Sequence, residues 1–193
     1  MTETDLSAVP EEFVRVLHSL RGARLRPEVV LEEVPAPGRI APYSVALTGE
    51  VHPRRGGEVD ELASGRFVVL HDPAGQDAWE GTLRVVTLLR AAVEDELAVD
   101  PLLSHAAWTW LEDALEESGV AYRALGGTVT RVISDTFGVL VERKGDVELE
   151  LRASWTPRDP ELGNHLEAWG MLLCTGAGLP PLPEGVTALA PRR

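Results

Sequence analysis

The residues best suited to chemistry in this chain are a few histidines, their acidic neighbours and one cysteine. His71 and Asp72 stand side by side, and an imidazole next to a carboxylate can ligate a divalent metal ion, as in phosphohydrolases. Pro73 and Gly75 follow at once, however, so this segment is typical of a turn. No evident set of partner histidines accompanies the pair. The sequence therefore predicts neither a metal site nor a cofactor.

Two further histidines and the cysteine are better explained by packing. His105 and His165 fall in the first two turns of predicted helices, where the helix dipole favours a neutral imidazole. Cys174, the only cysteine, lies in an apolar run, where burial raises the pKa of a thiol instead of activating it as a nucleophile. The chain also lacks a phosphate-binding glycine loop, a nucleophile-elbow serine and a distinctive pair of carboxylates. We therefore lean towards a protein that is not an enzyme.

The first half of the chain predicts one helix and several strands. Pro10 followed by two glutamates favours a helix start, and apolar residues follow at helical spacing: Phe13, Val16, Leu17 and Leu20. Beyond residue 28 the apolar pattern has a period of two. Strands are predicted at 43–51, 67–71 and 83–93, with a proline-rich break at 35–38 and a mobile loop at 53–65.

The second half predicts two more helices that begin with the same dipeptide. Asp100-Pro101 and Asp159-Pro160 each place a capping carboxylate before a proline, and Gly119 and Gly178 end the two helices. Strands at 128–133 and 147–155 lie between the helices. The fold class is therefore α+β, an antiparallel sheet with about three main helices.

The second and third helices also match each other position by position. Leu103 and Leu162, and Trp110 and Trp169, fall at the same offset from the capping aspartate, and the triplet 89–91 resembles the triplet 151–153. We interpret this as two strand-strand-helix units about a pseudo-twofold axis, with the two tryptophans in related positions beneath one sheet. Chance similarity between two capped helices is the alternative.

Two charged surfaces and a tail are candidate sites for a partner. The basic surface belongs to the first helix and the residues just after it: Arg15, Arg21, Arg24 and Arg26. The acidic surface ends the second helix, where carboxylates oppose the helix dipole: Glu112, Asp113, Glu116 and Glu117. These surfaces can meet within one chain or between two copies, or can simply face solvent. The proline-rich tail 179–193 is predicted to be extended, a form that docks on aromatic grooves or lies across its own domain.

A pocket between the sheet and the helices is a further candidate site. The residues that would line it are His71, Trp79, Arg90, Trp110, Trp155 and Trp169. Large rings at such positions are more often core material than a platform for a ligand.

Composition and charge exclude several classes of protein. The 193 residues suit a single α+β domain, with residues 1–9 as a flexible N-terminus. A net charge of -13 makes nucleic acid an unlikely partner. Because the chain has no secretory signal, no apolar run of the roughly 20 residues that span a bilayer and only one cysteine, we expect a cytoplasmic protein without a membrane partner.

Several unusual phrases are spread along nearly the whole chain. They are Arg26-Pro27-Glu28, Ala41-Pro42-Tyr43, Leu70-His71-Asp72-Pro73, Ala78-Trp79-Glu80-Gly81, 152–157 and 168–183. Through them the chain resembles an actinobacterial domain-of-unknown-function family, the family numbered 3000. The resemblance implies a bacterial cytosolic protein and no assigned activity, cofactor or catalytic residue. The order of elements also looks like that of small secretion chaperones, a likeness at the level of the fold that does not fix function.

Three functional hypotheses follow. The leading one is a non-enzymatic cytosolic binding or adaptor protein whose partner is another protein or a second copy of the chain. The alternative is a small-molecule-binding protein or enzyme that uses the pocket lined by tryptophan and histidine. A weaker alternative is a nucleic-acid-associated factor that binds through the basic first helix. A deep cleft near His71 or the paired helices would favour the second hypothesis, and flat surfaces would favour the first.

Overall fold

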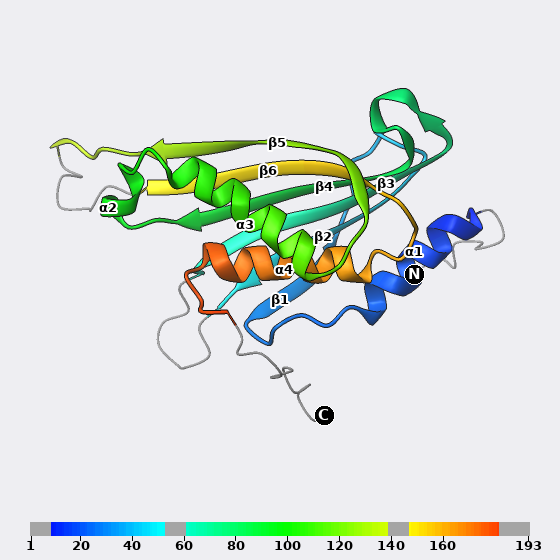
Figure 1. The fold of residues 1–193 in the computed structure, drawn as a ribbon, viewed down its shortest axis with the longest axis horizontal. Helices are drawn as coiled ribbons and strands as arrows, with labels where there is room; N and C mark the ends of the chain where they lie inside the picture. Colours follow the sequence, from blue (N-terminus) through cyan, green and yellow to red (C-terminus); the bar gives the residue numbers. More distant parts are fainter. Residues whose placement is uncertain (1–8, 53–60, 139–146, 182–193) are drawn as a thin grey trace.

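The computed structural model describes residues 9–52, 61–138 and 147–181, and in them the chain forms an open antiparallel sheet with helices on one face (Figure 1). The sheet has six strands in the order β1-β2-β3-β4-β6-β5. Their bounds are β1 Val29–Val34, β2 Tyr43–Val51, β3 Ala63–Gln76, β4 Gly81–Ala92, β5 Tyr122–Ile133 and β6 Val147–Pro157. The main helices are α1 Glu11–Gly22, α3 Leu103–Glu117 and α4 Gly163–Gly176, and the short ones are η2 Asp77–Trp79 and α2 Asp95–Ala98. The predicted α+β class is thus confirmed.

Alternation along the strands separates the two faces of the sheet. In β6 the odd-numbered residues from Val147 to Trp155 are buried, and every second residue of β4 is buried in the same way. Most of these residues form one core with the buried faces of α1, α3 and α4. On the other face a small cluster of Ala46, Val68 and Leu70 is buried, and much of the remaining face lies open to solvent. One covered and one open face is the usual arrangement of an antiparallel sheet.

The helix α1 forms as the sequence predicted. Phe13, Val16 and Leu20 are buried, and Leu17 packs against the same core from a half-buried position. The side chain of Glu12 fixes the helix to the sheet, because its Oε2 accepts a hydrogen bond from Thr82 Oγ1 at 3.1 Å.

The inner strands are symmetric about the contact between β4 and β6. Leu89 pairs directly with Leu151, the residue that occupies the matching place in the second sequence triplet. The first unit consists of β3, β4 and α3, and the second of β5, β6 and α4. In the order β3-β4-β6-β5, the second strands of the two units lie side by side at the centre, and the first strands lie outside them. In addition, α3 packs on β5 and α4 packs on β3 and β4, so each helix crosses the strands of the opposite unit. The two strand-strand-helix units therefore have a pseudo-twofold arrangement, and α1, β1 and β2 lie outside it.

The tryptophans correct one detail of the predicted repeat. Trp169 is fully buried above Gly65, so that a Cβ on this glycine would lie 3.0 Å from the indole. The corresponding ring on α3 is that of Trp108, because a Cβ on Gly127 would lie 2.8 Å from its Cζ3. Trp110 is half-buried on the outer side of the helical layer. The predicted equivalence of Trp110 and Trp169 is wrong because α3 presents the residue two positions earlier to the sheet.

Several boundaries also differ from the prediction. Asp100 Oδ1 accepts a hydrogen bond from Leu102 N at 2.8 Å, and Asp159 Oδ1 accepts one from Glu161 N at 2.9 Å. Each aspartate therefore caps a turn that precedes the helix, which begins a few residues later. The glycines that follow α3 and α4 have left-handed φ angles of 63° and 71°, as expected for helix ends.

Of the predicted loop 53–65, the structure describes only residues 61–65. β3 already begins at Ala63, so the last three residues of this range are strand. Residues 53–60 lie outside the described part of the chain, as do residues 1–8 and residues 182–193 of the predicted tail.

Candidate functional site

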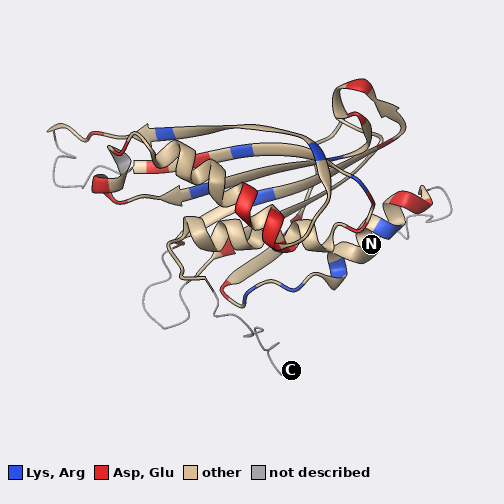
Figure 2. Cartoon of the chain, in the orientation of Figure 1, with Lys and Arg blue, Asp and Glu red and all other residues tan. Residues whose placement is uncertain are grey.

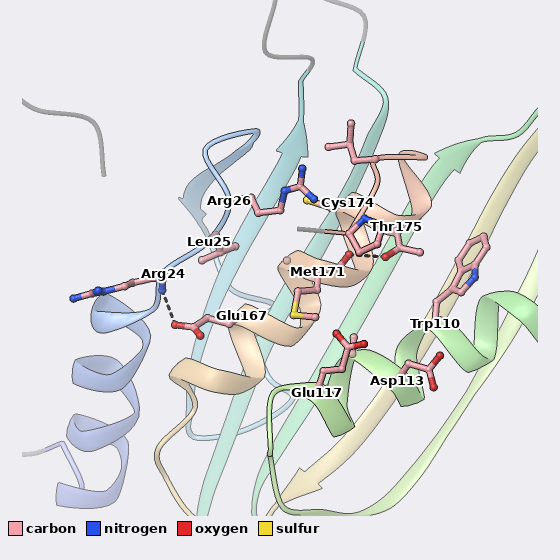
Figure 3. A pocket seen from close by; sticks show the side chains of 14 residues that line it. Arg24, Leu25, Arg26, Trp110, Asp113, Glu117, Glu167, Met171, Cys174 and Thr175 are labelled. Atoms are coloured by element: carbon pink, nitrogen blue, oxygen red, sulfur yellow. Dashed lines mark hydrogen bonds between the residues drawn. The ribbon is translucent and has the colours of Figure 1, made fainter. Parts of the chain in front are cut away.

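A groove of about 490 Å³ lies between α3 and α4, on the side of the helices that faces solvent. The segment 24–26, which follows α1, forms one side of the groove (Figure 3). Leu179 and Pro181, beyond α4, also line it. This volume falls within the range of ligand pockets in proteins.

The floor of the groove is apolar because α4 is apolar on most of its surface. Met171 and Cys174 contribute to the lining, and Leu25 packs directly over Gly170. A Cβ on Gly170 would lie 2.6 Å from Leu25 Cδ2, so only glycine allows the segment to approach the helix this closely. Met171 adds a flexible side chain that can adapt to different ligand shapes.

The wall formed by α3 carries negative charge. Asp113 and Glu117 line the groove together with Trp110 and Ala114. Within the described part of the chain, neither carboxylate takes part in an ion pair or a hydrogen bond. Two unpaired carboxylates beside an apolar floor favour a ligand that combines a cationic group with an apolar one.

The opposite wall is basic: the guanidinium of Arg26 is engaged, while that of Arg24 is exposed and has no ion pair within the described residues. Arg26 Nη1 donates to the carbonyl oxygen of Pro180 at 2.8 Å, and Arg26 Nη2 lies 3.4 Å from Glu28 Oε1. The backbone N–H of Arg24 donates to Glu167 Oε1 at 2.7 Å (Figure 3). These bonds hold the segment 24–26 and the start of the C-terminal segment against the helices.

Cys174 is buried next to the groove and does not have the environment of a reactive thiol. Burial is the main cause that raises the pKa of Cys174 to about 11. At neutral pH the residue is a thiol and not a nucleophilic thiolate, which agrees with its interpretation as a small core residue.

His165 is also part of the core. Trp155 Nε1 donates a hydrogen bond to His165 Nδ1 at 3.0 Å, which requires this nitrogen to be unprotonated. Burial lowers the pKa of His165 to about 4, although the negative charge of Asp159 acts in the opposite direction. His105, by contrast, is exposed on α3. The two histidines do not form a functional pair.

His71 faces the core and Asp72 does not. The His71 ring stacks on Phe13 with an interplanar angle of 7°, and Nδ1 lies 3.1 Å from the carbonyl oxygen of Thr82. Asp72 accepts hydrogen bonds from Ala74 N and Gln76 Nε2, and the predicted turn is an irregularity within β3, where the pairing with β4 is interrupted between His71 and Gln76. Because neighbouring residues of a strand point to opposite faces, the imidazole and the carboxylate do not converge on one ion. In the described residues no group of histidine, cysteine and carboxylate side chains is arranged to hold a metal.

The six residues predicted to line one pocket lie in different parts of the molecule. Trp155 and Trp169 are fully buried in the main core, and Trp79 packs against the small cluster on the opposite face of the sheet. Arg90 is exposed on that same face, where its Nε lies 2.9 Å from Glu150 Oε2. Of the six, Trp110 alone contributes to the groove.

The predicted charged surfaces meet the groove only in part. Arg24 and Arg26 lie on one wall, and Asp113 and Glu117 lie on the other. Glu112 and Glu116 extend the acidic surface along the exposed side of α3, while Arg15 and Arg21 are exposed on α1. Figure 2 shows acidic positions along α3 and basic positions on α1.

Sequence reasoning missed the apolar part of the groove. No sequence pattern marked Leu25, Gly170 and Met171 as residues of a binding site. Each stands in a segment that is typical of an ordinary core helix or loop. The low charge of the predicted third helix was the one usable signal, and it indicated burial without indicating which side of the helix stays accessible.

The fold and the groove together define the structural class of the protein. The chain is an α+β domain with an open antiparallel sheet and a surface groove on its helical layer, and the described residues include no helix that could cross a membrane. A family model described as "Protein of unknown function (DUF3000)" matches residues 9–187, and the chain belongs to this family. Neither the curated proteins nor the solved structures include a match.

Proposed function

We propose that this chain is a non-enzymatic binding protein that captures a short segment of a partner protein in the groove between α3 and α4. The segment has an apolar anchor, which enters the groove, flanked by lysine or arginine. The observation that carries the proposal is the pair of unpaired carboxylates, Asp113 and Glu117, on the rim of an apolar groove. A basic ligand would neutralise charges that the described residues leave without a partner.

The acidic surface is longer than the groove, which supports a peptide over a smaller ligand. Glu112 and Glu116 continue the row of carboxylates on the exposed side of α3. Trp110, half-buried at the groove, offers a ring that can contact either an apolar side chain or a cation. An anchor with basic flanks would use both features at once, as in other helix-groove complexes.

Fluorescence polarisation with two pools of labelled peptides tests the proposal. Both pools carry the same leucine, phenylalanine or tryptophan anchors, and one has lysine and arginine flanks while the other has glutamate flanks. We expect binding of the basic pool only, and weaker binding as the salt concentration rises. Equal binding of both pools, or binding of neither, would contradict the proposal.

A pair of variants locates the binding site. The double change Asp113→Asn and Glu117→Gln should weaken binding about fivefold, the effect of losing about 1 kcal/mol of charge interaction. The control changes Glu11→Gln and Glu161→Gln remove the same charge from exposed positions that do not line the groove. An equal loss in the control would mean that net charge, and not the groove, determines binding.

A small organic molecule with a cationic group is the second candidate ligand, because a groove of about 490 Å³ is also large enough for one. Tryptophan fluorescence against a metabolite library tests this alternative, with Trp110→Phe as the variant that should remove the signal from the groove.

The weaker hypothesis of nucleic-acid binding rests on the exposed Arg15 and Arg21. It requires an affinity that falls steeply with salt.

We also propose that the protein works in the cytoplasm of an actinobacterium. The resemblance through the phrases named in the sequence analysis and the single, buried cysteine support this proposal. Cell fractionation with an antibody to the native protein would test it, and recovery from the membrane or the medium would refute it.

A further inference from the structure

The two edges of the sheet differ in how they are protected against pairing with another strand. β1 is six residues long, carries exposed Glu32 and Glu33, and is followed by prolines at positions 35 and 37. β5 is twelve residues long and contains neither proline nor an acidic residue. Short length, charge and proline are the usual devices that keep an edge strand from pairing. β1 has all of them, and β5 has only two arginines.

Within the residues that the structure describes, no strand lies beside β5 at the place where the pseudo-twofold arrangement has β2 beside β3. β5 occupies the place in its unit that β3 occupies in the other, and the outer edge of β3 is paired with β2 in antiparallel register. The ring of Trp169 is covered in part by β2, since a Cβ on Gly49 would lie 2.7 Å from it. Trp108, its counterpart above β5, has no such strand beside it in the described residues and stays half-buried.

Apolar side chains are exposed at the end of this same edge. Val132 and Ile133 at the end of β5 are 45% and 60% exposed, and Phe137 just beyond is 78% exposed. Arg131 Nη1 donates to the carbonyl oxygen of Asp100 at 2.8 Å, which brings a second group of exposed apolar residues close by: Leu97, Val99 and Leu102. Figure 1 shows α2 next to the end of β5. Most of the large apolar side chains that the described residues expose therefore gather at one end of the unprotected edge.

We propose that β5 pairs with β5 of a second copy, in antiparallel orientation, to form one continuous sheet across a homodimer. The strand is regular from Gly126 onwards, after a bulge at 124–125. A twofold axis perpendicular to the sheet requires facing residues to share a face, so the axis passes beside a residue and not between two. An axis beside Val129 or Thr130, at the middle of the regular span from Gly126 to Ile133, lets most of this span pair. Either position sets Arg131 opposite Gly127 or Val129 of the other copy, so no arginine faces another arginine.

Sedimentation velocity over a range of protein concentrations tests the proposal. We expect twice the monomer mass of 20.9 kDa at high concentration, and reversible dissociation on dilution. Thr130→Lys should raise the dissociation constant at least tenfold, because it places like charges near each other across the axis. The control Val30→Lys puts the same charge on the other edge strand, at a residue that is 55% exposed, and should leave the dimer intact.

A cross-linking experiment does not depend on how well the lysine variants fold. Val129→Cys and Thr130→Cys place a thiol next to the axis, so one of them should form an intermolecular disulfide on mild oxidation. Val30→Cys should not, and the native Cys174 is buried. A protein that stays monomeric at all concentrations, a dimer that Thr130→Lys leaves unchanged, or cross-linking that is equal at Val30 would each overturn the proposal.

Discussion

At the scale of single residues, the buried pair of Trp155 and His165 makes the stability of the protein depend on pH. The folded state keeps His165 neutral, because burial lowers its pKa from 6.5 to about 4. The unfolded chain binds a proton near pH 6.5, so protonation favours unfolding. The contribution is fully present above pH 6.5 and is lost as the pH falls towards 4. At about 1.4 kcal/mol for each pH unit in this window, the loss reaches about 3 kcal/mol.

Urea unfolding at a series of pH values measures this effect. His165→Leu should flatten the fall in the free energy of unfolding between pH 6.5 and 4, although it leaves Trp155 Nε1 without its acceptor and lowers stability at neutral pH. His105→Leu, at an exposed site on α3, is the control and should keep the slope of the native protein. An unchanged slope in the His165 variant would show that other groups cause the pH dependence.

Gly170 supports a second prediction at this scale. Gly170→Ala would bring a Cβ within 2.6 Å of Leu25 Cδ2, so the leucine must move and the groove must change shape. We expect a loss of stability of about 1 kcal/mol and weaker binding of the basic peptides. Gly22→Ala at the end of α1 meets no atom within 4 Å and should be neutral or slightly stabilising. Thermal unfolding and the polarisation assay together separate the two effects.

Residue types predicted the core better than they predicted the groove. Cys174 and His165 were correctly interpreted as packed residues, since an apolar helix leaves few other places for them. The six residues assigned to one pocket were chosen by type alone. Their faces depend on strand and helix registers, which place Trp79 and Arg90 on the far side of the sheet from Trp155.

At the scale of elements, Arg84 on β4 bonds to both β6 and the bulge of β5. Its Nη1 donates to the carbonyl oxygen of Ala124 and to Thr156 Oγ1, and its Nη2 donates to Ser154 Oγ at 2.7 Å. Ala124 has a left-handed φ of 50°, which a non-glycine residue adopts only when its surroundings hold it there. Partial burial lowers the pKa of Arg84, but an arginine remains charged and keeps its donors.

Removing these donors should loosen one strand and not the whole sheet. We expect Arg84→Ala to lower the free energy of unfolding by about 0.5–1.5 kcal/mol, the usual net contribution of a hydrogen bond, because the Ala124 carbonyl is exposed and Ser154 is half-buried. Hydrogen exchange should become faster at the amides of β5 near the bulge, with little change in β2 and β3. Arg66→Ala, at an exposed arginine on the same face, is the control. Uniform acceleration across all strands would instead mean that Arg84 stabilises the fold as a whole.

Elements with strong periodicity could be predicted from sequence, and their exact starts could not. β2 has the bounds that alternation gave, and α1 begins one residue after the predicted proline. The starts of α3 and α4 were placed too early because an aspartate before a proline also caps an isolated turn. The sequence suggested a near-repeat, but the two-residue difference between Trp108 and Trp110 depends on how each helix packs on its strands.

At the scale of the whole molecule, the two proposed surfaces lie on different sides of α3. The groove is on the side that faces α4 and solvent, and the free edge of β5 is next to the side that carries Trp108. Peptide binding and dimerisation should therefore be independent unless α3 itself moves. The variants Asp113→Asn with Glu117→Gln should leave the dissociation constant of the dimer unchanged, and Thr130→Lys should leave peptide affinity unchanged.

Thermal unfolding can measure both equilibria in one experiment. Because a dimer is favoured at high concentration, the Tm of the native protein should rise with protein concentration, and the Tm of Thr130→Lys should not. A basic peptide at 100 times its dissociation constant should add about 2.7 kcal/mol of stability to both proteins. If the peptide raises the Tm only of the native protein, the groove requires the dimer, and the two surfaces are coupled through α3. If protein concentration changes neither Tm, β5 does not form a dimer contact, and any peptide binding in the groove is a property of the monomer.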